Sequence, residues 1–525
     1  MLATVLATAI IASAWLLATA PAVLAQDASP RGPAAAEITR LPADQRSHHT
    51  LTLPGRMLRF TAIAGSIPMT NTAGRVLADV AFTAHLLDGA DKRTRPLTFA
   101  FNGGPGAAST WLQLGALGPW RVPLTGDTVR TKAAPALLDN AETWLDFTDL
   151  VFIDPPGTGH SRIWPAIERN PPTAQGGGRG RGETQRSAEA GGPAWFWSIR
   201  GDIATFASFI ANWTRSNERT GSPIVLAGES YGGFRAPLIA QALKSDHAVA
   251  VHAMVLVSPV LDFDGRRGWL QPHHYVALLP SIAATRLERS GVVPTRAALA
   301  EAETYARGEY LVDLVRGPRD TQASERIAAR IAAFTGLDVE KVRKHDGRLG
   351  GRSFVQESAG FGDKAVSLYD AGISGLEPAG GDQRGFGDPF TSGLTAPLTA
   401  AMATLHARLD WRVERRYLMH SGEANRSWTW RNSPHPPEAL GALLDLHRKD
   451  PKLMTLATHG FTDLVTPYFA SALQLDQLPT YGQTQRIKLE VYPGGHMHYS
   501  RDDSRARFRD DVEKVIGEVV QPSVR

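Results

Sequence analysis

The 525-residue sequence contains no cysteine. The chain therefore has no disulfide, no thiolate ligand for zinc or an iron–sulfur cluster, and no cysteine nucleophile. An excess of charge of one sign is also lacking, because 56 Lys and Arg stand against 52 Asp and Glu. This balance does not favour a nucleic-acid-binding protein, and no Walker lysine follows a glycine-rich loop. The hydrophobic fraction of 43% is typical of a globular protein and excludes disorder for most of the chain.

The first 25 residues have the features of an export signal. Residues 2–25 carry no charge, and Val23 and Ala25 occupy the −3 and −1 positions of a signal-peptide cleavage site. No basic residue precedes the apolar run, which is long enough to span a bilayer, so an uncleaved membrane anchor is the alternative. We expect a bacterial protein exported to the periplasm or secreted, with no membrane span after the signal peptide (residues 1–25) is removed. The sequence does not indicate an oligomeric state.

Short apolar runs alternate with helical periodicity along most of the chain. The runs typical of strands buried on both faces are residues 150–154, 224–227, 253–259, 452–458 and 487–492. Residues 46–101 instead read as antiparallel edge strands that lead into a central one. Apolar residues repeat with helical spacing from Ile199 to Trp213 and from Phe508 to Val519. The pattern predicts an α/β fold with a mostly parallel central sheet and helices on both faces.

Two segments interrupt this alternation. Residues 171–193 are rich in glycine, arginine and small polar residues, which favours a mobile loop over an RGG-like RNA-binding tract. Residues 265–449 lie between two predicted core strands and are mostly helical in pattern. We expect this insertion to form a lid, a separate layer over one end of the sheet. The core would then consist of residues 26–264 and 450–525.

The strand at 224–227 continues directly into Gly228-Glu229-Ser230-Tyr231-Gly232, and a helical pattern follows. This G-x-S-x-G arrangement between a strand and a helix indicates a nucleophile elbow, whose sharp turn places the serine hydroxyl at the positive end of the helix. Ser230 is therefore the predicted nucleophile. An ordinary serine in a glycine-rich turn is the alternative.

A serine nucleophile needs a base, and the base needs a carboxylate to orient it. In this fold class both follow the serine, first the acid and then the histidine, each after a later strand. Asp463 follows the strand at 452–458 and His496 follows the strand at 487–492, so they are the predicted acid and base. His498 is the alternative base. The two histidines have no evident third ligand for a metal, and we expect neither metal nor cofactor.

A second glycine-rich turn, Asn102-Gly103-Gly104-Pro105-Gly106, follows the strand that ends at Phe101. Acyl transfer needs two backbone N–H donors for the oxyanion, one after the nucleophile and one from an upstream loop of this kind. Tyr231 and Gly104 are the predicted oxyanion donors. A simple turn is the alternative.

Five segments together resemble the serine carboxypeptidase family. They are FNGGPGAAS, LVFIDPPGTGHS, AGESYGG, HGFTDLVTP and GGHMHYS, and they occur in the family's order from about residue 50 onward. The resemblance implies an α/β-hydrolase fold with a helical insertion and removal of residues from peptide C-termini. It gives Ser230, Asp463 and His496 the same three roles, and it implies that Asn102 and Glu229 bind the terminal carboxylate of the substrate.

The sequence departs from the family where that carboxylate is recognised. A further glutamate of the family's network corresponds to Ala116, and a tryptophan corresponds to Ala100. Two carboxyl groups that share a proton keep one of them neutral. Without this partner we expect Glu229 to ionise more readily and to repel a C-terminal carboxylate. We therefore predict intact acyl transfer, with C-terminal selectivity weakened or rebuilt by a basic group elsewhere.

The sequence thus predicts an exported serine carboxypeptidase-like hydrolase that cleaves peptide bonds near the C-terminus through an acyl-enzyme. An esterase or acyltransferase is the alternative, because the same triad acts on amides and esters. A non-catalytic binding protein with this fold is a third interpretation. The expected partner is a peptide or small ester, and no nucleic acid.

Overall fold

The computed structural model describes residues 40–124, 136–165, 190–263, 271–358, 365–375, 388–430, 436–480 and 485–520. All of them belong to one compact unit that begins at Arg40. The predicted signal peptide and most of the glycine-rich segment 171–193 lie outside the described residues. Within the described ranges, no helix has the length and apolar character needed to cross a membrane.

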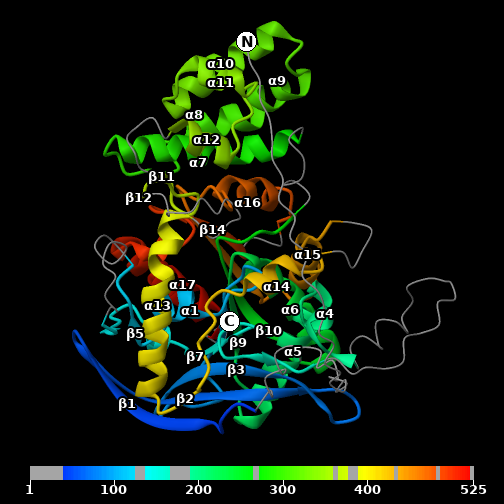
Figure 1. Ribbon diagram of the computed structural model, residues 1–525, viewed down its shortest axis with the longest axis vertical. Coiled ribbons are helices and arrows are strands. Elements are labelled where there is room, and N and C mark those ends of the chain that lie inside the picture. The colour runs from blue at the N-terminus through cyan, green and yellow to red at the C-terminus, as the bar shows by residue number, and fades with distance from the viewer. Residues whose placement is uncertain are drawn as a thin grey trace, which may run out of the picture. The chain divides into compact units, whose positions relative to one another are not determined.

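A ten-stranded sheet lies at the centre of the fold (Figure 1). Its order is β1–β2–β3–β7–β4–β9–β10–β13–β14, with β8 paired to β3. The antiparallel part consists of β1 (Gln45–Leu53), β2 (Arg56–Thr70), β3 (Val76–Leu87) and β8 (Arg162–Ile163). The parallel part consists of β7 (Asp149–Ile153), β4 (Leu97–Phe101), β9 (Ile224–Glu229), β10 (Val251–Val257), β13 (Met454–Gly460) and β14 (Ile487–Tyr492). The predicted α/β fold with a mostly parallel sheet is confirmed.

Helices cover both faces of the parallel strands. On one face lie α4 (Pro193–Phe196), α5 (Ile199–Ser216) and α6 (Tyr231–His247), and on the other lies α17 (Asp502–Val520). Alternate side chains of a strand point to opposite faces. In β10, Val255 packs in the same cluster as Phe508 of α17, whereas Leu256 packs with Phe206 of α5. Strands β9, β10 and β13 are thus buried on both sides, as their continuous apolar runs predict. The same prediction for residues 487–492 is wrong, because β14 lies at the edge of the sheet and only its last two residues are fully buried.

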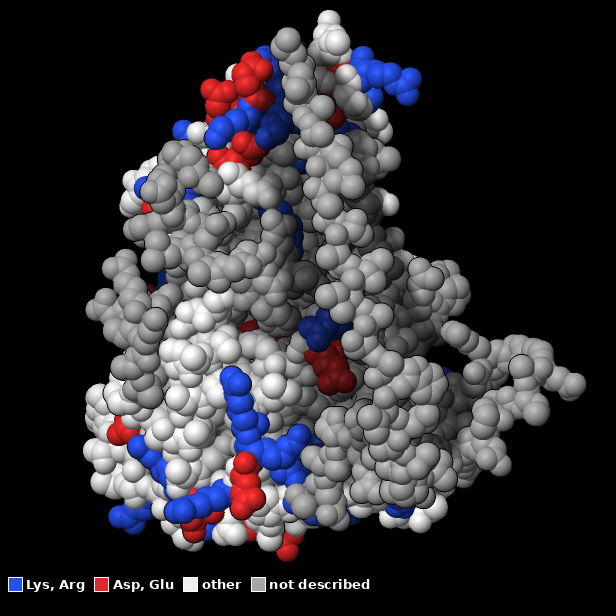
Figure 2. Space-filling model, in the orientation of Figure 1, with Lys and Arg blue, Asp and Glu red and all other residues white. Residues whose placement is uncertain are grey.

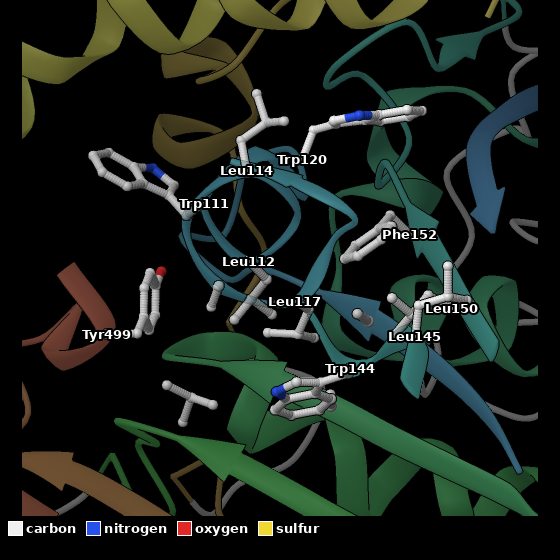
Figure 3. Packing of buried hydrophobic residues seen from close by; sticks show 14 of the residues in the cluster. Trp111, Leu112, Leu114, Leu117, Trp120, Trp144, Leu145, Leu150, Phe152 and Tyr499 are labelled. Atoms are coloured by element: carbon white, nitrogen blue, oxygen red, sulfur yellow. The ribbon is translucent and has the colours of Figure 1, made fainter. Parts of the chain in front are cut away.

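The segment after β4 folds back into the cluster on the α17 side. It comprises α1 (Thr110–Leu112), the π-helix η1 (Gln113–Leu117), β5 (Trp120–Arg121), β6 (Leu138–Asp139) and η2 (Trp144–Asp146). Trp111, Leu112 and Leu117 pack there, and Tyr499 from the short helix η6 (His498–Ser500) stands beside them (Figure 3). The turn after β4 is thus anchored by a buried segment.

The residues between β10 and β13 divide into two parts. The first contains α7 (Pro272–Arg289), α8 (Ala300–Tyr305), η4 (Ala306–Tyr310), α9 (Leu311–Arg316), α10 (Thr321–Thr335), α11 (Val339–Lys344) and α12 (Gly351–Ser358). These helices share their own apolar cluster, which includes Leu279, Tyr310 and Ile331. Helix α7 lies between them and α16 (Tyr468–Leu475), as Figure 1 shows. This part is a separate layer.

The second part packs on the central sheet unit instead. It contains α13 (Pro389–Arg408), α14 (Gly422–Arg426) and α15 (Leu440–Lys449). Leu398 of α13 lies in the cluster on the α17 side, and Leu443 of α15 lies in the cluster of α5 and α6. A small hairpin, β11 (Ala365–Val366) and β12 (Ser374–Gly375), stands between the two parts in the sequence. We therefore restrict the proposed lid to α7–α12.

Acidic and basic side chains are interleaved over α10 and α11 (Figure 2). Arg343 pairs with Glu325 and Glu340, and Arg330 pairs with Glu301. This mixed surface agrees with the even charge balance of the sequence.

Candidate active site

Five parallel strands deliver the predicted site residues to one edge of the sheet. Strands β4, β9, β10, β13 and β14 all end on this edge, and the residues that follow them include Asn102, Ser230, Ser258, Asp463 and His496. The carboxyl edge of a parallel sheet is where α/β proteins bind their ligands. The topology therefore gathers residues that are far apart in the sequence.

Ser230 lies in a strained turn between β9 and α6. Its φ of 61° and ψ of −120° are rarely adopted by a residue with a side chain. The turn is held by the Ser230 N–H, which donates to the Val257 carbonyl at 2.8 Å. A Cβ on Gly228 would clash with the Gly232 carbonyl, and one on Gly232 would come within 2.7 Å of the Phe101 carbonyl. Both flanking glycines are thus required by close backbone approach.

The structure brings Asp463 and His496 together. His496 Nδ1 lies 2.8 Å from Asp463 Oδ2, and both side chains are buried. Asp463 also accepts hydrogen bonds from the N–H groups of Val465 (2.8 Å) and Thr466 (2.9 Å) and from the Thr466 hydroxyl (2.6 Å). Donors on both carboxyl oxygens fix the orientation of the Asp463 side chain. Because Nδ1 faces the carboxylate, Nε2 is the ring nitrogen that faces away from it.

The end of β10 holds the serine turn and the histidine loop next to each other. Val257 accepts the hydrogen bond from the Ser230 N–H, and the next residue, Ser258, donates its hydroxyl to the His496 carbonyl at 2.7 Å. The Thr466 hydroxyl oxygen, which donates to Asp463, lies 3.0 Å from the Ser258 carbonyl oxygen. Adjacent residues of one strand thus link the loops that carry Ser230, Asp463 and His496.

The predicted oxyanion donors also lie at one place. A Cβ on Gly103 would come within 2.5 Å of the Tyr231 nitrogen, so the turn after β4 touches the start of α6. Gly104 has a φ of +100°, which favours glycine. Among the described residues, neither the Gly104 N–H nor the Tyr231 N–H donates to a protein group. Two such N–H groups side by side can bind the oxygen of a polarised carbonyl.

The alternative base, His498, lies in the core. Its ring packs 4.8 Å from the Tyr492 ring and 5.0 Å from the Phe508 ring, and its Nε2 contacts the Thr458 hydroxyl at 3.2 Å. Burial lowers the pKa of His498 to about 3. These contacts favour His496 over His498 as the base.

Asn102 and Glu229 form a buried pair beneath the serine turn. Asn102 Nδ2 donates to Glu229 Oε1 at 2.8 Å, and Asn102 Oδ1 accepts the Leu112 N–H at 3.1 Å. The second carboxyl oxygen of Glu229 accepts a hydrogen bond from the Tyr499 hydroxyl. The polar atoms of both side chains are therefore engaged within the protein.

The protonation of Glu229 differs from the sequence-based expectation. Burial raises the pKa of Glu229 to about 7, although the charge of His496 and the hydrogen bonds from Tyr499 and Asn102 lower it. We expected easier ionisation because the position of the second carboxyl group is Ala116. Loss of water around the carboxyl group outweighs that absence.

Tyr499 is a site residue that the sequence analysis missed. Its only signal is a pair of small residues in the buried segment after β4: a Cβ on Gly115 would lie 2.7 Å from Tyr499 Cε2, and Ala116 follows. Small side chains there leave room for the Tyr499 ring, which stands beside Trp111 and Leu112 in Figure 3. The pairing joins positions 229 and 499, which no local pattern connects.

A cavity of about 330 Å³ adjoins the Asp463–His496 pair. It is lined mainly by apolar residues after β10 and β13 and on α7, including Val260, Leu261, Leu464 and Ala277. Thr466 both lines the cavity and contacts His496 Nδ1 at 3.0 Å. The cavity can accept an apolar group of a molecule that reaches the site.

The described residues contain no group of three or more His, Asp or Glu side chains arranged to hold a metal ion.

Known proteins similar to this chain include serine carboxypeptidases. Residues 55–263 match the family described as serine carboxypeptidase. The chain is 28% identical over 193 residues to serine carboxypeptidase-like 36 from Arabidopsis thaliana, which covers 36% of this chain and 32% of that protein. The chain thus matches about a third of the length of this curated relative.

Among solved structures, the chain is similar to Kex1, a prohormone-processing carboxypeptidase from Saccharomyces cerevisiae. The TM-score is 0.52 at 17% identity, and the match covers 87% of this chain and 91% of the other. At this identity the likeness supports the shared fold.

Proposed function

We propose that the chain is a member of the serine carboxypeptidase family, which residues 55–263 match, and that it is a serine-type carboxypeptidase that cleaves peptide bonds near the C-terminus through an acyl-enzyme on Ser230. The observation that carries the proposal is the buried contact of 2.8 Å between His496 and Asp463 at the sheet edge that also holds the strained Ser230 turn. A serine, a carboxylate and a histidine in this chain order are the parts of a catalytic triad.

In the proposed mechanism, His496 Nε2 takes the proton of the Ser230 hydroxyl as its oxygen attacks the scissile carbonyl carbon. Asp463 keeps the proton on Nδ1 and stabilises the imidazolium. The Gly104 and Tyr231 N–H groups hold the oxyanion. His496 then protonates the leaving amine, and water hydrolyses the ester under base catalysis by His496.

The proposal places the substrate against two further features. Asn102 and Glu229 are the proposed contacts for the C-terminal end of a peptide, and the 330 Å³ cavity beside Thr466 receives an apolar side chain. Within the proposed division into a core (residues 26–264 and 450–525) and an insertion (265–449), helices α7–α12 form the lid. We also propose export through residues 1–25 of a bacterial chain, on the sequence pattern alone.

The Tyr499–Glu229 contact favours a second candidate function, an esterase or acyltransferase. Both oxygens of Glu229 accept hydrogen bonds from Asn102 and Tyr499, and the residue has no second carboxyl group with which to share a proton. We expect such a site to bind the free carboxylate of a substrate less tightly. The same serine chemistry would then act on substrates without one.

Replacing Ser230 tests the proposal. A fluorophosphonate should label the wild-type protein and not Ser230→Ala, and kcat should fall by about 10⁶-fold because no nucleophile remains. Ser245→Ala, an exposed serine on α6, is the matched control and should be labelled like the wild type. Labelling of Ser230→Ala at the wild-type rate would refute the nucleophile assignment.

Substrate class is tested separately with three matched compounds: a blocked dipeptide with a free C-terminus, its C-terminal amide and its ester. Preference for the free acid supports the carboxypeptidase. Turnover of the ester alone supports the second candidate.

A further inference from the structure

The loop of the β11–β12 hairpin lies directly against the proposed base. The His496 N–H donates to the Tyr369 carbonyl at 2.6 Å, and the Tyr369 ring lies edge-to-face with the imidazole at 5.3 Å and 85°. A Cβ on Gly495 would clash with the Tyr369 carbonyl, which explains why a glycine precedes the histidine. The hairpin therefore fixes both the backbone and the ring of His496.

Asp370, the next residue, connects this hairpin to the loops of both the acid and the base. It is 2% exposed. Its carboxylate accepts the Thr462 hydroxyl at 2.7 Å, one residue before Asp463, and pairs with Arg501 at 3.0 Å, five residues after His496. The Ala371 N–H adds a bond of 3.0 Å to the Thr462 carbonyl.

Arg501 extends the connection to the lid. The same guanidinium nitrogen that contacts Asp370 lies 2.6 Å from Glu288 near the end of α7. Glu288 is largely buried, and pairing with Arg501 offsets the cost of burying its charge. One arginine thus joins the hairpin, the histidine loop and a lid helix.

We propose that Tyr369 and Asp370 are positioning residues for His496, so that the insertion takes part in activating Ser230 as well as in covering the site. The inference rests on the proposed function. The reason is geometric. The His496 ring must align with Asp463 on one side and Ser230 on the other, and a shift of its loop by about 1 Å lowers the rate of the reaction. The backbone of His496 is then held at its carbonyl by the Ser258 hydroxyl and at its N–H by the Tyr369 carbonyl.

Several ionisable groups surround His496. Asp463 contacts its ring, Glu229 interacts with it electrostatically, and the buried His459 and His498 lie nearby with pKa values lowered to about 4 and 3, so both are neutral near neutral pH. Asp370 packs against Gly495, the residue before His496, and holds the histidine loop through Arg501 and the hairpin. Tyr369→Leu leaves the charge of Asp370 in place, so it separates an effect of position from one of charge.

The experiment compares Asp370→Asn, Tyr369→Leu and the control Asp313→Asn in the full chain. Asp313 is a buried carboxylate that pairs with Arg326 at 2.7 Å within the lid and is placed in no catalytic role. We expect Asp370→Asn to lower kcat and the rate of fluorophosphonate labelling by about 10- to 100-fold, with KM within about twofold. The acid limb of the kcat/KM profile should move to lower pH, because a looser contact with Asp463 makes the imidazole less basic.

Tyr369→Leu keeps the ion pairs of Arg501 with Asp370 and Glu288. It should also lower the labelling rate, because the ring contact with His496 is lost. Arg501→Lys keeps a charge beside Asp370 and should retain more activity than Arg501→Met, which removes it. Asp313→Asn should label at the wild-type rate even if its melting temperature falls.

The outcomes separate the two proposals. If the wild type is not labelled at all, the proposed function fails. If the wild type is labelled and folded Asp370→Asn and Tyr369→Leu react equally fast, only the positioning role is overturned. If Asp370→Asn does not fold, the labelling rates of Tyr369→Leu, Arg501→Lys and Arg501→Met test the positioning role instead.

Discussion

Glu229 occupies the position before Ser230, and both of its carboxyl oxygens accept hydrogen bonds within the protein. Burial raises its pKa to about 7, so the group is mostly neutral in mildly acidic solution and mostly ionised above neutrality. A substrate carboxylate brought beside it would meet a neutral group in the first case and a like charge in the second.

We therefore predict that selectivity for a free C-terminus depends on pH. From about pH 6 to pH 8, kcat/KM for a free-acid peptide relative to its amide should fall by about tenfold, because ionised Glu229 repels the carboxylate. Glu229→Gln, which cannot ionise, should flatten this ratio. Tyr499→Phe removes a hydrogen bond that lowers the pKa of Glu229, so the transition should move to higher pH. A ratio independent of pH in the wild type would contradict the prediction.

The residues of the proposed triad could be predicted because each follows a strand in the order that the fold requires. Tyr499 could not, since its contact with Glu229 joins positions 270 residues apart and depends on the space left beside Gly115. The pKa of Glu229 was predicted in the wrong direction, because the sequence gives neighbours in the chain and not the depth of burial.

At the scale of the elements, the turn after β4 and the first turn of α6 meet where the oxyanion is proposed to bind. They approach closely at Gly103, where a Cβ would lie only 2.5 Å from the Tyr231 nitrogen. The two elements follow neighbouring strands, because β4 pairs with β9 in the sheet, and the buried segment around Trp111 also anchors the turn after β4.

Gly103→Ala should therefore separate the two donors. We expect kcat to fall by about 100-fold or more, the cost of losing one oxyanion donor, while KM changes little. Gly517→Ala on α17 is the control: a Cβ there meets nothing within 4 Å, and alanine in a helix should raise stability by up to about 1 kcal/mol. Wild-type kcat in folded Gly103→Ala would exclude this turn from the oxyanion site.

Elements with strong periodicity were predictable from the sequence. Strand β14 has the predicted bounds, and α5 begins at the predicted Ile199. The division of the helices between β10 and β13 was not predictable. Helix α13 buries its apolar side chains on the central unit, whereas α7–α12 bury theirs on one another and on α16 and the loop after β13. Periodicity identifies an apolar helix face and not its partner. The same limit hid the hairpin that carries Tyr369.

For the whole molecule, the buried histidines make the stability of the fold depend on pH. Burial lowers the pKa values to about 3 or 4 at His85, His160, His406, His420, His447, His459 and His498. In the unfolded chain these groups bind protons below about pH 6.5, so the unfolded state takes up more protons and stability falls as the pH drops from 6.5 toward 4. Asp154 and Glu229, whose pKa values burial raises to about 6 and 7, act in the opposite direction.

His85 offers a sharp test of this behaviour. Its ring is fully buried beside Phe60, Trp120 and Phe152, and neither ring nitrogen has a hydrogen-bond partner among the described residues. We predict that His85→Phe raises the melting temperature, and raises it more at pH 5 than at pH 7.5. Each such histidine lowers the free energy of unfolding by up to about 1.4 kcal/mol for every pH unit of acidification, and its removal abolishes that loss. An equal increment at both pH values would rule out the proton-linked explanation.

The order of the strands along the chain has a consequence for biosynthesis. Ser230 follows β9, whereas Asp463 and His496 follow β13 and β14, which enter the sheet last in sequence. A ribosome delivers the alcohol long before the carboxylate and imidazole that would activate it. A half-made chain thus carries the Ser230 hydroxyl without its proposed base and acid, so the proposed activity can arise only when translation is nearly complete.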